Sequence, residues 1–284
     1  MAIILDGKII SQKVKDEIAV EVNQLVSDGN RPPCLAVVLV GDDEGSKVYV
    51  RNKKRACEAI GFTSLEFILP TETLQDELDK LIDFLNDDDN VDGILVQLPL
   101  PKHLNEMSII NRISTKKDVD AFHPENVGRI MLGNPLFLPC TPAGVMRMLK
   151  DYNISVSGKE CVVVGRSNIV GKPMSLLLLA ANGTVTTCHS RTLDLAEVTR
   201  RADILVVAIG IPRKITGDMI KEGAVVIDVG MNRSDGVLCG DVDFTDCLSK
   251  ASYITPVPGG VGLMTIAMLM QNTLTAYKLH MGIK

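Results

Sequence analysis

The sequence is poor in the features that mark nucleic-acid-binding, membrane-bound and secreted proteins. Its formal net charge is −5 and it lacks long basic runs, which argues against binding to nucleic acid or an anionic membrane. Its start lacks the basic residues and cleavage site of a signal peptide, and no segment approaches the ~18 uninterrupted apolar residues of a membrane span. We therefore expect a cytoplasmic protein with no nucleic acid and no membrane among its partners.

Metal-ligand spacings and closely paired cysteines are also lacking. The four histidines form no H-E-x-x-H or similar pattern, so we expect no metal site. The seven cysteines form no C-x-x-C pair, and most have apolar neighbours, which is typical of small core residues in a reducing compartment. These cysteines are Cys34, Cys57, Cys140, Cys161, Cys188, Cys239 and Cys247.

What the sequence contains is an alternation of strands and helices in each half. The strands expected in the first half are 34–41, 64–69 and 93–98, between helices at 8–27, 45–62 and 74–86. The strands expected in the second half are 160–165, 184–188, 203–210 and 224–230, with helices at 170–181 and 263–281. This order predicts parallel sheets with right-handed crossovers.

These elements predict an α/β fold with two α/β domains and a cleft between them, the second domain being a Rossmann-like parallel sheet. We assign residues 1–140 plus 264–284 to the first domain and 141–263 to the second. The final helix is placed in the first domain because it is longer than the second sheet requires. Thr73 is expected to cap the helix that follows it.

One lysine lies on the apolar side of the predicted helix within 45–62. At about 100° of rotation per residue, Tyr49, Cys57 and Ile60 share one stripe, and Lys53 falls within it. A buried ammonium group is costly unless it is paired. Lys53 is therefore either a side chain whose end reaches solvent from the edge of the stripe, or a lysine kept for chemistry.

A glycine-containing loop joins the strand 160–165 to the helix after it. Gly165, Ser167 and Gly171 form a variant of the dinucleotide fingerprint, in which glycines permit a tight turn and close helix packing. The backbone N–H groups at the helix start can hold a pyrophosphate. Ser167 stands where the middle glycine is usual, so an ordinary strand–helix turn remains an alternative.

The next strand indicates which nucleotide would bind. It ends in His189, Ser190 and Arg191, whereas an NAD site usually has a carboxylate there for the ribose hydroxyls. Hydrogen-bond donors and a cation suit a 2′-phosphate, and Arg166 adds positive charge. We therefore favour NADP over NAD as the cofactor, with a solvated polar turn as the alternative reading.

Three further loops are expected at the carboxyl ends of strands, where open parallel sheets bind ligands. Gln97 lies at the exit of 93–98, and Asp118 and Asp120 lie in a loop that is too polar to be core. Glycines in 258–262 could bring main chain close to a flat ligand. Each loop alone could be a turn, but together with the Tyr/Lys helix and the nucleotide loop they indicate a dehydrogenase.

The Y-x-x-x-K spacing of Tyr49 and Lys53 also occurs in short-chain dehydrogenases. There the pair follows the glycine loop, whereas here it precedes Gly165 by more than a hundred residues. Chain order therefore argues against that family.

Five segments resemble the methylenetetrahydrofolate dehydrogenase/cyclohydrolase family of the bifunctional FolD type. They are YVRNKKRACEAIG, DGILVQLPLPKH, KDVDAFHPENVG, VVVGRSNIVGKP and ITPVPGGVG, and the similarity runs in order along nearly the whole chain. The resemblance implies an NADP-dependent enzyme of one-carbon metabolism with a tetrahydrofolate derivative as substrate. Such an enzyme oxidises 5,10-methylenetetrahydrofolate to 5,10-methenyltetrahydrofolate, hydrolyses this product to 10-formyltetrahydrofolate, and is usually a homodimer.

The resemblance also implies roles for individual residues. Lys53 would be the catalytic lysine, Gln97 would hydrogen-bond and tune it, and Tyr49 would orient the substrate. Asp120 would anchor the pterin ring. The folate site would further include Pro258, Gly259 and Gly260, and the first domain would be the catalytic, folate-binding one. The cofactor would contact Gly165, Arg166, Ser167, Ser190 and Met231.

The two reactions make different demands on the protein. Hydride transfer needs alignment, whereas hydrolysis needs proton movement, which a lysine shielded from water can provide. Two positions depart from the family pattern, since Ala121 stands where glycine is common and Leu263 where proline is usual. A relative with dehydrogenase activity only and a non-catalytic NADP-binding regulator remain alternatives.

Overall fold

The computed structural model describes residues 1–234 and 236–283, which form two compact units. The Rossmann unit comprises Met1–Gln12 and Pro139–Thr265, and the three-stranded unit comprises Lys13–Leu138 and Ile266–Lys284. The sequence-based division placed residues 1–12 in the first domain, but these residues lie in the Rossmann unit. The reason is that the short strand β1 (Ile3–Ile4) hydrogen-bonds to the last strand of that unit's sheet.

The Rossmann unit contains a six-stranded sheet in the order β1-β11-β8-β7-β5-β6, and every pairing within it is parallel. After β1, its strands are β5 (Glu160–Val164), β6 (Thr184–Cys188), β7 (Ile204–Val207), β8 (Val225–Asp228) and β11 (Tyr253–Ile254). A separate antiparallel hairpin joins β9 (Asn232–Ser234) and β10 (Val237–Cys239). The mixed α/β fold with a parallel sheet is confirmed.

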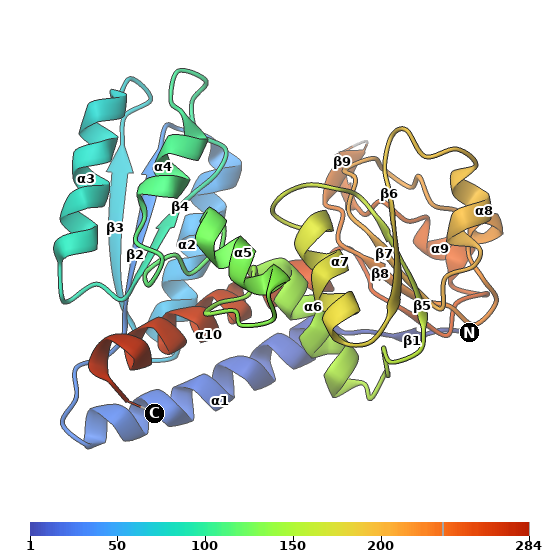
Figure 1. The fold of residues 1–284 in the computed structure, drawn as a ribbon, viewed down its shortest axis with the longest axis horizontal. Coiled ribbons are helices and arrows are strands. Elements are labelled where there is room, and N and C mark those ends of the chain that lie inside the picture. The colour runs from blue at the N-terminus through green and yellow to red at the C-terminus, as the bar shows by residue number, and fades with distance from the viewer. Residues whose placement is uncertain (235, 284) are drawn as a thin grey trace. The chain divides into compact units, whose positions relative to one another are not determined.

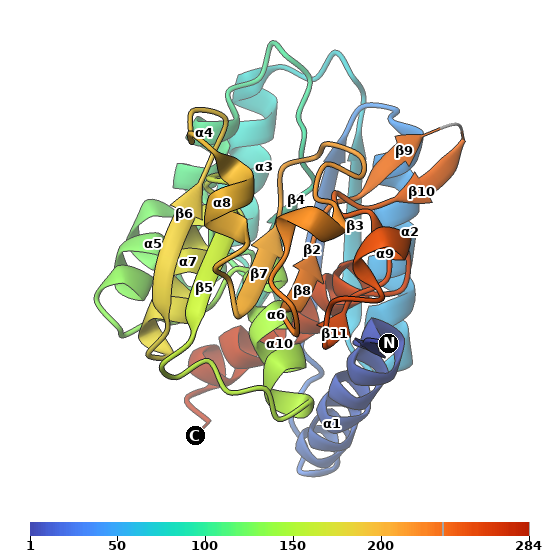
Figure 2. The same ribbon diagram turned by 90° about the vertical axis from the view of Figure 1, so that its right-hand side faces the viewer.

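Helices cover both faces of this sheet, with α6 and α7 on one side and α8 and α9 on the other (Figures 1 and 2). Their bounds are α6 (Cys140–Asp151), α7 (Gly171–Ala180), α8 (Leu195–Thr199) and α9 (Phe244–Cys247), and a 3₁₀ turn covers Gly217–Met219. Alternate strand residues such as Val162, Val164 and Leu205 pack in one core cluster with side chains of α8 and α9. The central strands β5, β7 and β8 are almost entirely buried because both faces are covered, whereas the edge strand β6 is partly exposed.

The strand order identifies the ligand-binding edge of this sheet. From β5 the chain moves to β6 on one side and then to β7 on the other, so the order reverses beside β5. In open α/β sheets, ligands bind at such a switch point, beyond the carboxyl ends of the strands. The segments that follow β5 and β7 therefore occupy the place where a nucleotide is expected.

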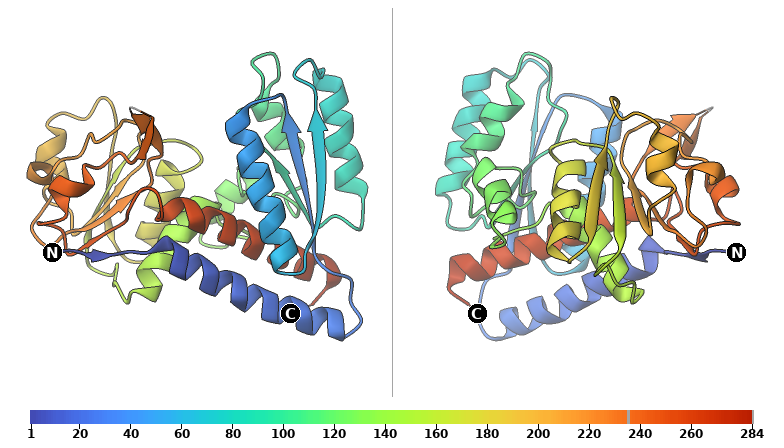
Figure 3. Two further views of the ribbon diagram at one scale, coloured as in Figure 1. Left: turned by 180° about the vertical axis from the view of Figure 1, so that it is seen from behind. Right: turned by 45° about the vertical axis from the view of Figure 1, so that its right-hand side comes forward.

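The three-stranded unit has a parallel sheet in the order β3-β2-β4, with α2 on one face and α3 and α4 on the other (Figures 1 and 3). Its strands are β2 (Cys34–Val40), β3 (Thr63–Leu69) and β4 (Gly93–Val96). Its helices are α1 (Gly7–Ser27), α2 (Glu44–Ala59), α3 (Gln75–Asp87), α4 (Glu106–Arg112), α5 (Pro124–Met131) and α10 (Val261–Met281). The first residues of α1 and of α10 belong to the Rossmann unit. Residues Ala36 and Val38 of β2 pack against Leu78 and Ile82 of α3 in one core cluster.

The last helix, α10, packs within the three-stranded unit over most of its length. The amide of Asn272 donates hydrogen bonds to the carbonyl oxygens of Val119 and Leu138, both at 2.8 Å. The fully buried Tyr277 donates from its hydroxyl to the carbonyl of Arg31 at 2.8 Å. We find no candidate for a membrane span among the helices of residues 1–234 and 236–283.

Candidate functional site

Lys53 and Gln97 meet within the three-stranded unit, although 44 positions separate them in the chain. The Nζ of Lys53 donates a hydrogen bond to Oε1 of Gln97 at 2.9 Å, and both side chains are half-buried. Gln97 directly follows β4, and its Nε2 donates to the carbonyl of Leu98 at 2.8 Å. The amide orientation is therefore defined by both of its ends, and its oxygen faces the lysine.

The helix α2 carries Lys53 on its buried side. The helix begins after Asp43, whose carboxylate accepts the N–H of Ser46 at 2.7 Å, and it ends before Gly61, whose φ is +81°. Ser46 and Cys57, which flank Lys53 along the helix face, are only 5% and 0% exposed. The expectation that Tyr49 lies in the buried stripe is wrong, since Tyr49 is 37% exposed.

Asp118 differs from its expected role. We expected a polar loop outside the core, but Asp118 is 2% exposed and accepts hydrogen bonds from the backbone N–H groups of Phe122 and His123 and from Asn126 Nδ2. Burial raises the pKa of its carboxyl group. Asp118 thus stabilises the loop through hydrogen bonds within it. The half-buried Asp120 lines a small cavity of this unit.

Ala121, one of the two departures from the family pattern, occupies an unusual backbone conformation in the same loop. Its φ is +59°, in the left-handed region that glycine adopts at low cost. This conformation explains physically why a glycine suits the position. The alanine is accommodated there with its side chain fully buried.

In the Rossmann unit, the glycine loop lies at the switch point. Gly165 has a φ of +133°, and a Cβ on it would collide with the carbonyl oxygen of Ala208, which follows β7. A Cβ on Gly171 would in turn collide with the carbonyl of Gly165. The Oγ of Ser167 accepts the N–H groups of Val170 and Gly171 at 3.2 and 3.3 Å, so this serine hydrogen-bonds the start of α7.

The polar residues after β6 stand beside this loop. The N–H of Gly165 donates to the carbonyl of Cys188 at 2.9 Å, which ties the loop to the end of β6. Ser190 and Arg191, which follow, are exposed, as is Arg166. The arrangement presents a hydroxyl and two guanidinium groups to solvent at the carboxyl ends of β5 and β6. This set of donors fits the 2′-phosphate of NADP.

The 258–262 loop and Met231 approach each other in the same unit. A Cβ on Gly262 would lie 3.3 Å from Cε of Met231, and Met231 is 50% exposed. Pro258 is exposed, and the carbonyl of Gly259 accepts the N–H of Gly7 at 2.9 Å. Gly260 is buried, and a Cβ there would lie 2.5 Å from the carbonyl oxygen of Pro256. Main chain therefore forms much of this surface.

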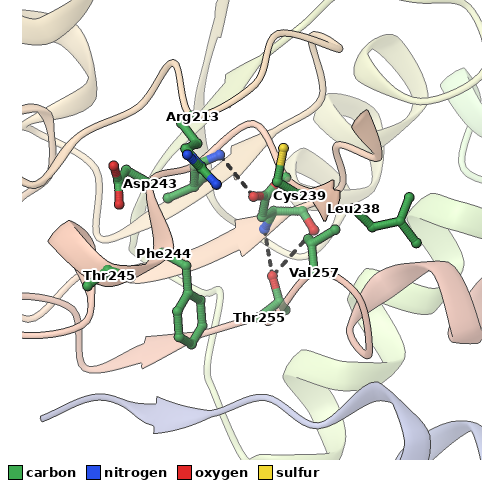
Figure 4. A pocket seen from close by; sticks show the side chains of 11 residues that line it. Arg213, Leu238, Cys239, Asp243, Phe244, Thr245, Thr255 and Val257 are labelled. Atoms are coloured by element: carbon green, nitrogen blue, oxygen red, sulfur yellow. Dashed lines mark hydrogen bonds between the residues drawn. The ribbon is translucent and has the colours of Figure 1, made fainter. Parts of the chain in front are cut away.

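A cavity of about 400 Å³ lies in the Rossmann unit near the end of β8. Arg213, Asp243 and Thr255 are among its lining residues (Figure 4). Our sequence analysis assigned no functional role to the residues that line this cavity. Nearby, the structure completely buries Asp241, which the sequence places in an acidic stretch with Asp243 and Asp246, so its composition gave no sign of burial.

The predicted site residues divide between the two units. Tyr49, Lys53, Gln97 and Asp120 lie in the three-stranded unit, and Gly165, Arg166, Ser167, Ser190, Met231, Pro258, Gly259 and Gly260 lie in the Rossmann unit. The seven cysteines are all buried free thiols. Within residues 1–234 and 236–283, no group of three or more histidine, cysteine, aspartate or glutamate side chains could hold a metal ion.

Comparison with known proteins gives a consistent result along the whole chain. Residues 5–120 match the catalytic-domain model of tetrahydrofolate dehydrogenase/cyclohydrolase, and residues 139–281 match its NAD(P)-binding-domain model. The Bifunctional protein FolD of Acetivibrio thermocellus is 60% identical over 282 residues, which cover 99% of each chain.

Solved structures agree with these matches. The bifunctional FolD methylenetetrahydrofolate dehydrogenase/cyclohydrolase of Campylobacter jejuni superposes with a TM-score of 0.96 at 51% identity, covering 98% of this chain and 99% of that one. The Trypanosoma brucei dehydrogenase–cyclohydrolase, solved with NADP and an inhibitor, gives 0.94 at 38% identity, covering 98% of both chains. The chain therefore belongs to the tetrahydrofolate dehydrogenase/cyclohydrolase family.

Proposed function

We propose that this chain is a bifunctional folate enzyme. It oxidises 5,10-methylenetetrahydrofolate to 5,10-methenyltetrahydrofolate with NADP, and it hydrolyses the methenyl compound to 10-formyltetrahydrofolate. The observation that carries this proposal is the 2.9 Å hydrogen bond between Lys53 and Gln97, in a chain that matches both domain models of the family. The amine of Lys53, held in place by the amide of Gln97, supplies the group that accepts and donates protons in the hydrolysis.

The proposed division of labour follows from the chemistry of the two steps. Hydride transfer requires that substrate and cofactor be aligned, and no side chain must gain or lose a proton. Hydrolysis requires that a water molecule lose a proton and that a ring nitrogen gain one. Lys53 is the proposed group for this transfer, Gln97 holds its amine in place, and the exposed face of Tyr49 orients the substrate. Asp120 and the main chain at 258–260 are proposed to bind the folate.

NADP is the proposed cofactor, and when bound it supplies the hydride acceptor. Gly165 and Ser167 are proposed to hold its pyrophosphate at the start of α7, because backbone at a helix N-terminus binds anions. Ser190 and Arg166, with Arg191 beside them, are proposed to bind the 2′-phosphate. Met231 is proposed to line the cofactor site on the side of the 258–262 loop.

One assay tests the proposed function directly. The purified protein is mixed with 5,10-methylenetetrahydrofolate and NADP, and NADPH and the methenyl chromophore are followed together. The proposal requires NADPH to accumulate without a matching accumulation of the methenyl compound, after spontaneous hydrolysis is subtracted. Equal accumulation of both would identify a relative with dehydrogenase activity only, and NADP binding without turnover would identify a non-catalytic regulator.

Two further properties belong to the same proposal. We infer that the protein works as a homodimer, which light scattering on the purified protein would test by its molar mass. We also infer a cytoplasmic location, because its seven buried thiols are the form of cysteine that a reducing compartment maintains. Fractionation of cells that produce the protein would test this location.

A further inference from the structure

The carboxylate of Asp241 collects four hydrogen bonds from two separate segments of the Rossmann unit. Its Oδ2 accepts the N–H groups of Ile209 and Gly210 at 2.7 and 3.0 Å. Its Oδ1 accepts the N–H of Ile211 at 2.9 Å and the Nδ2 of Asn232 at 2.8 Å. Asp241 is fully buried, so these donors replace the water that an ionised carboxylate would otherwise require.

The segment 209–211 lies at the switch point of the sheet. It directly follows Ala208, whose N–H donates to the carbonyl of Val164 at 2.8 Å and whose own carbonyl leaves no room for a Cβ on Gly165. Residues 209–211 are therefore the β7 counterpart of the glycine loop after β5. The crevice between two such loops is where an open α/β sheet binds its nucleotide.

The second segment that Asp241 holds is the exit of β8. Asn232 directly follows Met231, which is a proposed cofactor residue, and its amide is tied to the same carboxylate as 209–211. One buried side chain thus connects the chain after β7 to the chain after β8. Neither segment can move independently without breaking hydrogen bonds to Asp241.

The backbone of Asp241 is itself anchored by a second buried carboxylate. Asp228 Oδ1 accepts the N–H groups of Gly230 and Asp241 at 2.9 and 3.0 Å, and its Oδ2 accepts the N–H of Val242 at 2.9 Å. The N–H of Asp228 donates to Oγ1 of Thr255 at 2.7 Å, on the wall of the cavity in Figure 4. Two adjacent buried carboxylates are a costly arrangement. Both carboxylates accept hydrogen bonds from backbone N–H groups, and these bonds hold the loops after β7 and β8 in place.

We infer that Asp241 is a positioning residue of the cofactor site: it holds 209–211 and, through Asn232, the chain at Met231 in the arrangement that accepts NADP. The inference rests on the proposed function, since the cofactor is the one assigned there. It predicts that weakening these hydrogen bonds impairs the NADP-dependent reaction selectively. Hydrolysis uses no cofactor, and its proposed residues Lys53 and Gln97 lie in the other unit.

The test is the variant Asp241→Asn, which keeps the shape of the side chain but replaces one acceptor oxygen with an NH₂ group. Kd for NADP, kcat and KM for NADP, and the rate of methenyltetrahydrofolate hydrolysis are measured on the purified full-length protein. We expect kcat/KM for NADP to fall about 10- to 100-fold and Kd to rise, since hydrogen bonds to a charged group are lost. The rate of hydrolysis should stay close to the native value.

Asp246→Asn is the matched control. The carboxylate of Asp246 also accepts a backbone N–H, from Gly217 at 2.6 Å, but it is exposed and does not contact 209–211 or Asn232 through any of the bonds above. This variant should keep native values for all four quantities. An unchanged Kd and KM for NADP in a folded Asp241→Asn protein would overturn the inference, as would a parallel loss of both activities.

A second variant covers the case in which Asp241→Asn does not fold. Asn232→Leu removes only the amide donor and leaves the buried carboxylate in place, and we expect it to raise Kd for NADP in the same direction by a smaller factor. An unchanged Kd in this variant would then overturn the inference. Should the native protein bind NADP without turning over folate, the proposed function fails, and Kd alone still decides the role of Asp241.

Discussion

The Nζ of Lys53 lies 2.9 Å from Oε1 of Gln97, whose own Nε2 is engaged by the carbonyl of Leu98. A neutral amide thus fixes the position of the amine without adding a negative charge next to it. The next residue shows the contrast, since Lys54 forms an ion pair with Glu66 at 3.2 Å. A carboxylate partner places a negative charge beside a lysine, whereas an amide oxygen accepts its hydrogen bond without a formal charge.

Replacing Lys53 with methionine should separate the two proposed activities. Lys53→Met keeps the length and apolar body of the side chain but removes the amine, so hydrolysis of methenyltetrahydrofolate should fall about 10²- to 10⁴-fold, the usual worth of general acid–base catalysis. NADP-dependent oxidation should fall less. Stopped assays of each half-reaction measure this, with Lys54→Met on the same helix as the control. Equal loss of both activities in a folded variant would contradict the division of labour.

Replacing Gln97 with glutamate should change the pH dependence of hydrolysis. Gln97→Glu puts a carboxylate where the amide oxygen now faces Lys53, and this charge stabilises the ammonium form of the lysine. The rising limb of the rate–pH profile for hydrolysis should therefore move to higher pH, with a lower rate at neutral pH. Gln97→Leu, which adds no charge, should lower the rate without that displacement. A Gln97→Glu profile that coincides with the native one would show that this contact does not control the lysine.

The choice between NADP and NAD should depend on the arginines beside the glycine loop. Arg191→Ala should lower kcat/KM for NADP by about 10- to 100-fold, the effect of losing a hydrogen bond to a charged group worth ~1.5–3 kcal/mol. The value for NAD should be nearly unchanged, since NAD has no 2′-phosphate. Arg200→Ala, at the exposed end of α8, is the control. A native enzyme that prefers NAD would show that the residues after β6 do not bind the 2′-phosphate of NADP.

Asp228 should give the stability of the protein a specific pH dependence. Burial raises the pKa of its carboxyl from 3.8 to about 6 in the folded protein, and the charge of Asp241 adds to this effect. The folded state therefore binds the proton more tightly than the unfolded state does. This proton binding stabilises the folded state fully at a pH below the pKa of the unfolded state, and the stabilisation is lost as the pH rises through the pKa of the folded state. The stabilisation that is lost amounts to about 3 kcal/mol, at 1.36 kcal/mol per pKa unit.

The measurement is the free energy of unfolding of the native protein and of Asp228→Asn across this pH range. Other carboxylates titrate in both proteins, so the difference between the two curves isolates Asp228. The free energy of unfolding of the native protein relative to that of Asp228→Asn should decrease as the pH rises between the two pKa values. A constant difference would show that Asp228 does not titrate there.

The regular elements with strong patterns were predicted well from sequence. The apolar runs that became β2 and β5 are buried strands with bounds within one residue of those expected, because a continuous β-branched run suits a strand covered on both faces. Lys53 was placed on the buried side of α2 by helical period alone. Helix starts were less certain: Thr73 is not the cap of α3, since its hydroxyl donates to Pro70 and the helix begins after Leu74.

Residues whose environment depends on distant parts of the chain were predicted less well. Tyr49 has the period of a core residue but is exposed, although Ser46 and Val50 near it on the same helix are buried, because helical period does not define how far each side chain is covered. Asp118 has the composition of a surface loop but is buried against donors of its own loop. The sequence around Ile3 and Ile4 did not indicate that they form a strand of the Rossmann sheet, since a two-residue strand is defined only by the strand it pairs with.

The sequence by itself determined the class of fold, the nucleotide-type loop and the family, because periodic burial and short motifs are local properties of the chain. It also indicated that Lys53 and Gln97 matter. Only the tertiary structure decided which donors surround each polar group, and so which carboxylates bind loops together, as Asp241 does. Hydrogen-bond partners of buried charges come from segments far apart in sequence, and they become specific only when the sheet has aligned the ends of its strands.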